Sequence, residues 1–172
     1  HPYTQSLLAA EPSGDPVVFN DNGAEPLLST NNLRVDFPLP KKWFFQQSTY
    51  FTAVAGANFT INKGQTLGVV GESGSGKSTL AMAILRLVNS KGAITFQQQR
   101  IDNFNQQQIR PLRKDLQIVF QDPFGSLSPR LCVADIISEG LTVHQQLTAE
   151  EREQKVIEGL LEVGLDPDIR HR

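Results

Sequence analysis

Short apolar runs predict several strands in the first two thirds of the chain. Residues 33–37 (LRVDF) alternate apolar and polar positions, as a half-buried strand does, and residues 52–62 (TAVAGANFTIN) predict one or two more strands. Residues 65–70 (QTLGVV) are nearly all apolar, which is typical of a strand covered on both faces. Residues 92–96 (GAITF) and 116–120 (LQIVF) predict two further strands.

After Pro129 the pattern becomes helical. Residues 133–146 and 148–165 carry apolar positions at helical spacing. Thr148 followed three residues later by Glu151 matches a capping box, so the second of these helices should begin there. Its expected apolar stripe and C-terminal stop are Val156, Leu160, Val163 and Gly164.

Residues 11–26 hold three prolines and two glycines, which indicates a linker, with a long surface loop as the alternative. The linker would separate a short segment, residues 1–10, from a domain that begins near residue 27. The glutamine runs at 97–99 and 106–108 predict solvated loops by default.

Composition narrows the functional classes. The 172 residues carry a net charge of −2, so no overall positive field would attract nucleic acid or anionic lipid. A single cysteine excludes an internal disulfide and fits a reducing compartment. No apolar stretch approaches the roughly 18 residues that a membrane span requires.

A glycine-rich loop with one lysine carries the strongest functional signal. Gly71, Gly76, Lys77 and Ser78 satisfy the pattern G-x-x-x-x-G-K-[S/T]. Glycines let several backbone N–H groups approach a polyphosphate at once. The helix predicted over residues 77–89 would add unpaired N–H groups and partial positive charge. The lysine would then reach the β- and γ-phosphates, and the serine hydroxyl would ligate Mg²⁺.

The alternative is a Gly/Ser-rich turn with a solvated lysine, but the position after an apolar strand and before a helix favours phosphate binding. The expected phosphate-contacting residues are Gly71, Glu72, Ser73, Gly74, Ser75, Gly76, Lys77, Ser78 and Thr79. Guanine specificity is unsupported, because the sole Asn-Lys pair, Asn62-Lys63, precedes the loop and lacks the required Asp.

Residues 69–87 (VVGESGSGKSTLAMAILRL) and 117–130 (QIVFQDPFGSLSPR) together resemble the ATP-binding subunits of ABC transporters, in the branch that imports dipeptides and oligopeptides. Within that branch the resemblance is to a type with two fused ATPase domains that imports peptides and microcin C. It implies an α/β P-loop NTPase fold over residues 27–172, with an antiparallel β portion near the N-terminus and the start of a helical subdomain at the C-terminal end. Residues 1–10 would be the tail of a preceding ATPase domain, so we expect an excerpt that spans a junction.

By this resemblance, Gln121 is a glutamine that joins the Mg²⁺ shell and the attacking water, and Lys77 and Gln121 are the catalytic candidates. The loop from Asp122 to Arg130 would lead to a surface that contacts integral membrane subunits. An aromatic residue upstream of the loop would stack on adenine. Tyr50 is the preferred candidate, and the full set comprises Trp43, Phe44, Phe45, Tyr50 and Phe51.

Several features of the family are absent from these residues: an LSGGQ-like signature, an apolar strand ending in Asp-Glu, and a switch histidine. His144 and His171 lie in other segments and are interpreted as surface residues. We therefore expect the intact protein to hydrolyse ATP and these 172 residues alone to be inactive. The strands would also lack sheet neighbours, which predicts exposed apolar surface.

The resemblance implies a function as well: ATP·Mg²⁺ binding and hydrolysis that power import of peptide-type substrates across the inner membrane. The implied partners are a second ATPase domain and integral membrane subunits, without nucleic acid, on the cytoplasmic face of the membrane. One alternative is a soluble ABC-type ATPase acting on nucleic acid or ribosomes. A P-loop kinase is another, although that chemistry does not require the VFQDP segment.

Overall fold

The computed structural model describes residues 1–9, 25–41, 48–122 and 124–172. The chain divides into two units, His1–Lys77 with Lys91–Arg100 and Ser78–Ser90 with Ile101–Arg172. Residues 11–24 of the expected linker lie outside the described residues. Pro26, the last residue of that expected linker, is the first residue of a strand.

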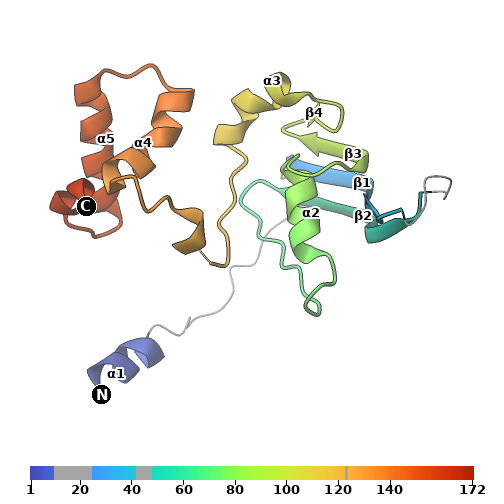
Figure 1. Cartoon of the computed structure of the whole chain (residues 1–172), viewed down its shortest axis with the longest axis horizontal. Helices are drawn as coiled ribbons and strands as arrows, with labels where there is room; N and C mark the ends of the chain where they lie inside the picture. The colour runs from blue at the N-terminus through green and yellow to red at the C-terminus, as the bar shows by residue number, and fades with distance from the viewer. Residues whose placement is uncertain (10–24, 42–47, 123) are drawn as a thin grey trace. The chain divides into compact units, whose positions relative to one another are not determined.

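The first unit is built on an antiparallel sheet of four strands in the order β2-β1-β3-β4 (Figure 1). The strands are β1 (Pro26–Pro38), β2 (Tyr50–Asn62), β3 (Lys91–Phe96) and β4 (Gln99–Arg100). In the register, Val35 lies opposite Val54, and Thr30 lies opposite Ile94. The sheet confirms the strands predicted over 33–37, 52–62 and 92–96 and the antiparallel β portion.

A bulge in β1 changes which positions face the core. Leu28 and Thr30 are buried before it, and Leu33 and Val35 after it, so the buried positions switch from even to odd numbers. Asn32 lies at the switch with a positive φ of 50°, and one extra residue in a strand produces this shift in alternation. A Cβ at Gly92 would overlap the Asn32 carbonyl oxygen, so the bulge requires glycine there.

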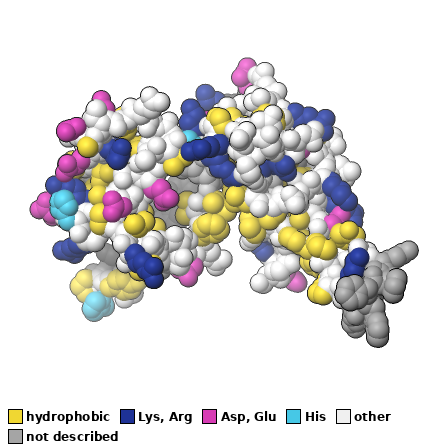
Figure 2. Space-filling view, turned by 45° about the horizontal axis from the view of Figure 1, so that its top comes forward, with side chains coloured by type: hydrophobic (Ala, Val, Ile, Leu, Met, Phe, Trp, Pro, Cys, Tyr) yellow, Lys and Arg dark blue, Asp and Glu magenta, His cyan; other side chains and the backbone are white. Residues whose placement is uncertain are grey.

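Two expected strands are not formed. Residues 66–70 and 117–120 have no regular secondary structure, and Val70 and Val119 are each 93% exposed. An apolar strand needs hydrogen-bonding neighbours, and no strand within the described ranges pairs with either segment. The result is the exposed apolar surface that the sequence predicts, and hydrophobic side chains gather in surface patches in Figure 2.

The helix that follows the glycine-rich loop is shorter than predicted. α1 (Pro2–Ala9) precedes the sheet, and α2 (Lys77–Ile84) ends five residues before the expected stop. Arg86 adopts a positive φ of 55°, and the Leu87 N–H donates to the Met82 carbonyl over 2.9 Å. This is the hydrogen-bond pattern of a helix C-cap, so α2 ends there although apolar residues continue.

The second glutamine run is helical, contrary to the loop expectation. α3 (Gln106–Ile109) begins at Asn105, whose side chain forms a capping box with Gln108. This reciprocal pair satisfies donors at the helix start and explains why a polar run is helical. The first run is a turn: Gln97 and Gln98 have positive φ angles between β3 and β4, while Gln99 belongs to β4.

Two helices at the C-terminal end agree closely with the sequence pattern. They are α4 (Val133–His144) and α5 (Ala149–Glu162), and the Thr148–Glu151 capping box is present. In the α5 stripe Val156 and Leu160 are buried, but Val163 is 68% exposed. The short 3₁₀ helix η3 (Pro167–His171) packs with α4 and α5. Within the described residues no helix has both the length and the apolar character to cross a bilayer.

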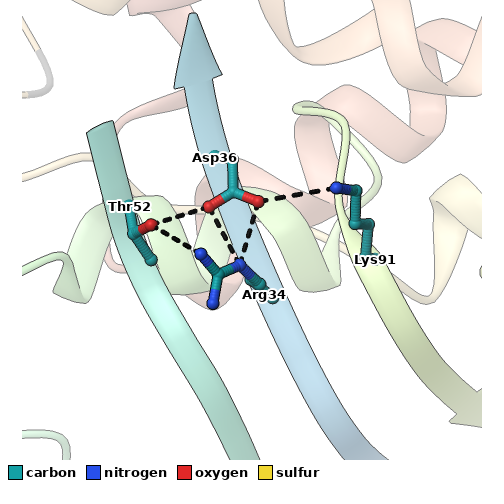
Figure 3. A network of polar contacts seen from close by, with 4 residues as sticks. All are labelled: Arg34, Asp36, Thr52 and Lys91. Atoms are coloured by element: carbon teal, nitrogen blue, oxygen red, sulfur yellow. Dashed lines mark hydrogen bonds and ion pairs between the residues drawn. The ribbon is translucent and has the colours of Figure 1, made fainter. Parts of the chain in front are cut away.

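A polar network lies across three strands of the first unit (Figure 3). The Arg34 Nε donates to both Asp36 carboxylate oxygens, at 3.0 and 2.9 Å, and Thr52 donates its hydroxyl to the same carboxylate over 2.8 Å. The Lys91 ammonium is 3.6 Å away. Hydrogen bonds from Arg34 and Thr52, with the positive charges of Arg34 and Lys91, lower the pKa of Asp36 from 3.8 to about 2.

This pKa predicts an acid-dependent contribution to stability. A carboxyl with a lowered folded-state pKa stabilises the fold above its unfolded pKa and loses that contribution as pH falls through its folded pKa. The melting temperature of full-length wild type should therefore exceed that of Asp36→Asn at neutral pH, and the difference should shrink between about pH 4 and pH 2. A difference that stays constant over this interval would contradict the assigned pKa.

Candidate functional site

The glycine-rich loop connects residues 66–70 with α2 and touches β2. Gly74 and Gly76 have φ angles of 81° and 95°, conformations that favour glycine. The Ser75 N–H donates to the Glu72 carbonyl over 3.2 Å and closes a turn. A Cβ at Gly76 would overlap the Ala53 carbonyl oxygen of β2. The loop is therefore seated on strand backbone, at a contact that only glycine permits.

The Lys77 side chain is held over the loop by hydrogen bonds to two loop carbonyls. Its ammonium donates to the Gly71 carbonyl over 2.9 Å and to the Glu72 carbonyl over 2.7 Å. An ammonium has three donors, so one remains for another acceptor. The side chain is half-buried, which keeps the charge close to the loop rather than extended into solvent. The positive charge and the loop's backbone thus lie together, as phosphate binding requires.

The remaining predicted phosphate-contacting residues lie in the loop and in the first turn of α2. Ser78 is exposed and Thr79 half-buried, both in the first turn of α2, where backbone N–H groups have no helical partner. Glu72, Ser73 and Ser75 are exposed. The sequence did not predict that Ala53 supports the loop through its carbonyl, which packs against Gly76. No pattern of residue types could reveal that contact.

The sequence predicted that Gln121 ends a buried strand. The structure shows no strand there. Gln121 is exposed and lies in a bend after the irregular residues 117–120. The following loop is irregular, as expected: it contains the short 3₁₀ helix η2 (Phe124–Ser126), and the Ser126 hydroxyl donates to the Asp122 carbonyl over 3.2 Å. Pro123 lies outside the described residues.

The adenine candidates divide into two groups. Trp43, Phe44 and Phe45 lie outside the described residues. Tyr50 is 60% exposed at the start of β2, and Phe51 is exposed beside it. Both precede Ala53 by two or three residues, so they lie roughly 6–10 Å along the strand from the point where β2 touches the loop. Both aromatic residues are on the strand that seats the loop.

In the part of the chain that the structure describes, metal-binding side chains are not clustered. Within the described ranges, no group of three or more His, Cys, Asp or Glu residues could hold a metal ion. His171 is exposed, in agreement with the surface interpretation, whereas His144 is half-buried in the last turn of α4.

Comparisons with known proteins agree with the loop geometry. The family described as ABC transporter matches residues 54–171. "Uncharacterized ABC transporter ATP-binding protein YejF" of Escherichia coli (strain K12) is 52% identical, covering 100% of this chain and 32% of that protein. "Peptidoglycan transport ATP-binding protein YejF" of Agrobacterium fabrum is 48% identical with the same coverage. "Oligopeptide transport ATP-binding protein AppF" of Bacillus subtilis (strain 168) is 41% identical over 86% of this chain and 46% of its own length.

A solved structure supports the fold. The ATP-binding cassette MJ0796, in a dimeric post-hydrolysis state bound to ADP and Pi, superimposes with a TM-score of 0.70 and 21% identity. The match covers 84% of this chain and 60% of that one. These findings confirm the P-loop NTPase fold and the resemblance stated from the motifs. The chain spans about a third of the length of both YejF proteins.

Proposed function

The chain belongs to the ABC transporter family, and on that premise we propose that the intact protein binds and hydrolyses ATP to power import of peptide-type substrates across the inner membrane. The observation that carries the proposal is the Lys77 ammonium, bonded to the Gly71 and Glu72 carbonyls beside a glycine loop seated on β2. The peptide-type substrate is supported by the resemblance of residues 69–87 and 117–130 to peptide importers and by the oligopeptide transport name of AppF.

In the proposed nucleotide site, backbone N–H groups of residues 71–76 bind phosphate oxygens, and the first turn of α2 adds unpaired N–H groups. Lys77 neutralises the β- and γ-phosphates with the donor that the loop carbonyls leave unused. Thr79 contributes a hydroxyl one residue after Ser78. Tyr50 stacks on the base, because it is exposed on the strand that contacts the loop.

The proposed cofactor is Mg²⁺, for which these residues offer oxygen donors. The Ser78 hydroxyl and the Gln121 side-chain carbonyl suit a hard cation, and the lack of a carboxylate cluster in the described residues fits an ion held mainly by nucleotide phosphates. When bound, Mg²⁺ would neutralise charge on the phosphates. The protein's own part is to position the γ-phosphate with Lys77 and to orient the attacking water with Gln121.

Hydrolysis needs more than these residues supply. Cleavage of the γ-phosphate requires a base and stabilising groups on the far side of the nucleotide. The sequence contains no Asp-Glu strand end and no LSGGQ-like signature. We therefore propose that a second ATPase domain and further residues complete the site, and that these 172 residues alone do not turn over ATP.

The proposed partners are integral membrane subunits, contacted through residues 122–130 after Gln121. This loop is irregular and exposes Leu127 beside polar residues, as a surface that receives a partner must. The protein would then lie on the cytoplasmic face of the inner membrane without spanning it. Nucleic acid is not among the proposed partners, because the net charge of −2 gives no attraction for phosphate backbones.

Affinity purification of the full-length protein from detergent-solubilised cells tests this assignment. We expect integral membrane subunits to co-purify and to remain bound after nuclease treatment. The variant Leu127→Ser, which removes the exposed apolar side chain of this loop, should retain ATP binding and lose the membrane subunits. Association with ribosomes or nucleic acid that nuclease treatment abolishes would instead support the soluble ATPase alternative.

A further inference from the structure

A pocket lined by basic side chains lies within the unit that contains α3 and α4. It has a volume of about 340 Å³. The pocket is bounded by α3, by the 3₁₀ helix η1 (Arg110–Lys114) and by the C-terminal end of α4. Its lining residues are Gln107, Arg110, Pro111, Lys114, Val143 and His144. This volume is within the range of small-molecule sites.

The charged side chains that line the pocket are all positive. Arg110 and Lys114 are cationic, His144 lines the pocket with them, and the lining residues within the described ranges include no Asp or Glu. None of these three side chains takes part in the ion pairs found among the described residues. Basic groups gathered without a carboxylate repel one another, and a bound anion removes that repulsion.

Arg113, a third basic residue of η1, has a structural role and does not line the pocket. Arg113 is half-buried and donates to the Leu85 carbonyl over 3.0 Å. Arg110 and Lys114 lie on either side of it in η1, are exposed, and line the pocket instead. One basic residue of η1 therefore fastens the helix to the segment after α2, and two remain for a ligand.

We propose that this pocket binds a phosphate-bearing anion. The guanidinium of Arg110 can bind two phosphate oxygens at once, while Lys114 acts as a point charge. His144 and the Gln107 amide each supply an N–H donor. Pro111 and Val143 give the pocket apolar walls for an uncharged part of the ligand. The phosphate belongs either to a small molecule in solution or to a lipid headgroup.

The site is separate from the glycine loop in its residues and in its chemistry. It uses side-chain cations on exposed short helices, whereas the loop relies on backbone N–H groups and Lys77. A test must therefore measure a property of a single residue in the pocket, because phosphate added to the full-length protein would also reach the glycine loop. Lys114 provides that local probe, and Lys155, an exposed lysine of α5, serves as an internal reference.

The experiment measures amine acylation of the full-length protein, followed residue by residue with mass spectrometry at constant ionic strength. Inorganic phosphate at roughly millimolar concentration should slow acylation of Lys114 by about threefold or more and leave Lys155 unchanged. Protection should be lost in Arg110→Gln. It should persist in the matched control Arg172→Gln, which removes an exposed arginine outside the pocket.

A vesicle arm distinguishes the two sources of phosphate. Vesicles of phosphatidylcholine with phosphatidylglycerol, compared with phosphatidylcholine alone, present the headgroup. Protection by free phosphate assigns a soluble ligand, and protection by the anionic vesicles alone assigns the headgroup. The proposal is overturned if neither probe protects Lys114, if Lys155 is slowed equally, or if Arg110→Gln retains full protection. It is also overturned if Lys114 is unreactive without any anion, since the protein itself would then fill the pocket.

Discussion

Replacing Lys77 with alanine in the full-length protein is expected to weaken ATP binding by about 100-fold or more. The free donor of the ammonium contributes a charge-assisted hydrogen bond to phosphate, which is worth about 1.5–3 kcal/mol. The ammonium also bridges the Gly71 and Glu72 carbonyls, so its loss leaves the loop less ordered. ATP affinity measured by calorimetry, together with hydrolysis rate, checks this expectation.

Lys63→Ala is the matched control, because it removes an exposed lysine that precedes the loop and lies outside its hydrogen bonds. That variant should bind ATP as wild type does. A melting temperature recorded without nucleotide separates lost contacts from lost folding. Wild-type affinity in Lys77→Ala would remove the basis of the proposed nucleotide site.

Adding one methyl group at Gly76 is expected to damage both stability and nucleotide binding. The Cβ of Gly76→Ala would overlap the Ala53 carbonyl oxygen, and φ at this position is 95°. The Ala53 carbonyl is part of the β2 backbone and cannot move aside as the end of a flexible side chain can. The glycine-rich loop and β2 must therefore move apart. We expect a loss of about 3 kcal/mol or more in unfolding free energy and little remaining ATP affinity.

Gly74→Ala provides a close comparison for this prediction. Gly74 has a φ of 81°, yet nothing lies within 4 Å of an added Cβ. Only the conformational cost of a left-handed residue remains, about 1–2 kcal/mol. Denaturant midpoints of the two full-length variants should therefore differ clearly. Equal midpoints would show that contact with β2 is not what makes glycine necessary at position 76.

Local sequence signals predicted the parts of the fold that local interactions determine. The Thr148–Glu151 capping box and the strands within β1, β2 and β3 follow from hydrogen bonding and alternation among near neighbours. The glycine-lysine loop was equally clear, because phosphate chemistry restricts several positions at once.

Other features depend on contacts between distant residues. Residues 66–70 and 117–120 have the composition of buried strands, but a strand forms only when another supplies hydrogen-bonding partners. Gly92 and Gly76 are required by carbonyl oxygens of Asn32 and Ala53, which no spacing rule connects to them. The early end of α2 likewise reflects the positive φ of Arg86. The residue type does not predict this conformation, because an arginine rarely adopts it.

The most direct measurement is a structure of the full-length protein with Mg²⁺ and a non-hydrolysable ATP analogue. The triphosphate is predicted to lie against the backbone N–H groups of residues 71–78, with the remaining donor of the Lys77 ammonium bonded to a β- or γ-phosphate oxygen. A nucleotide bound elsewhere, with Lys77 still bonded only to the Gly71 and Glu72 carbonyls, would contradict the account.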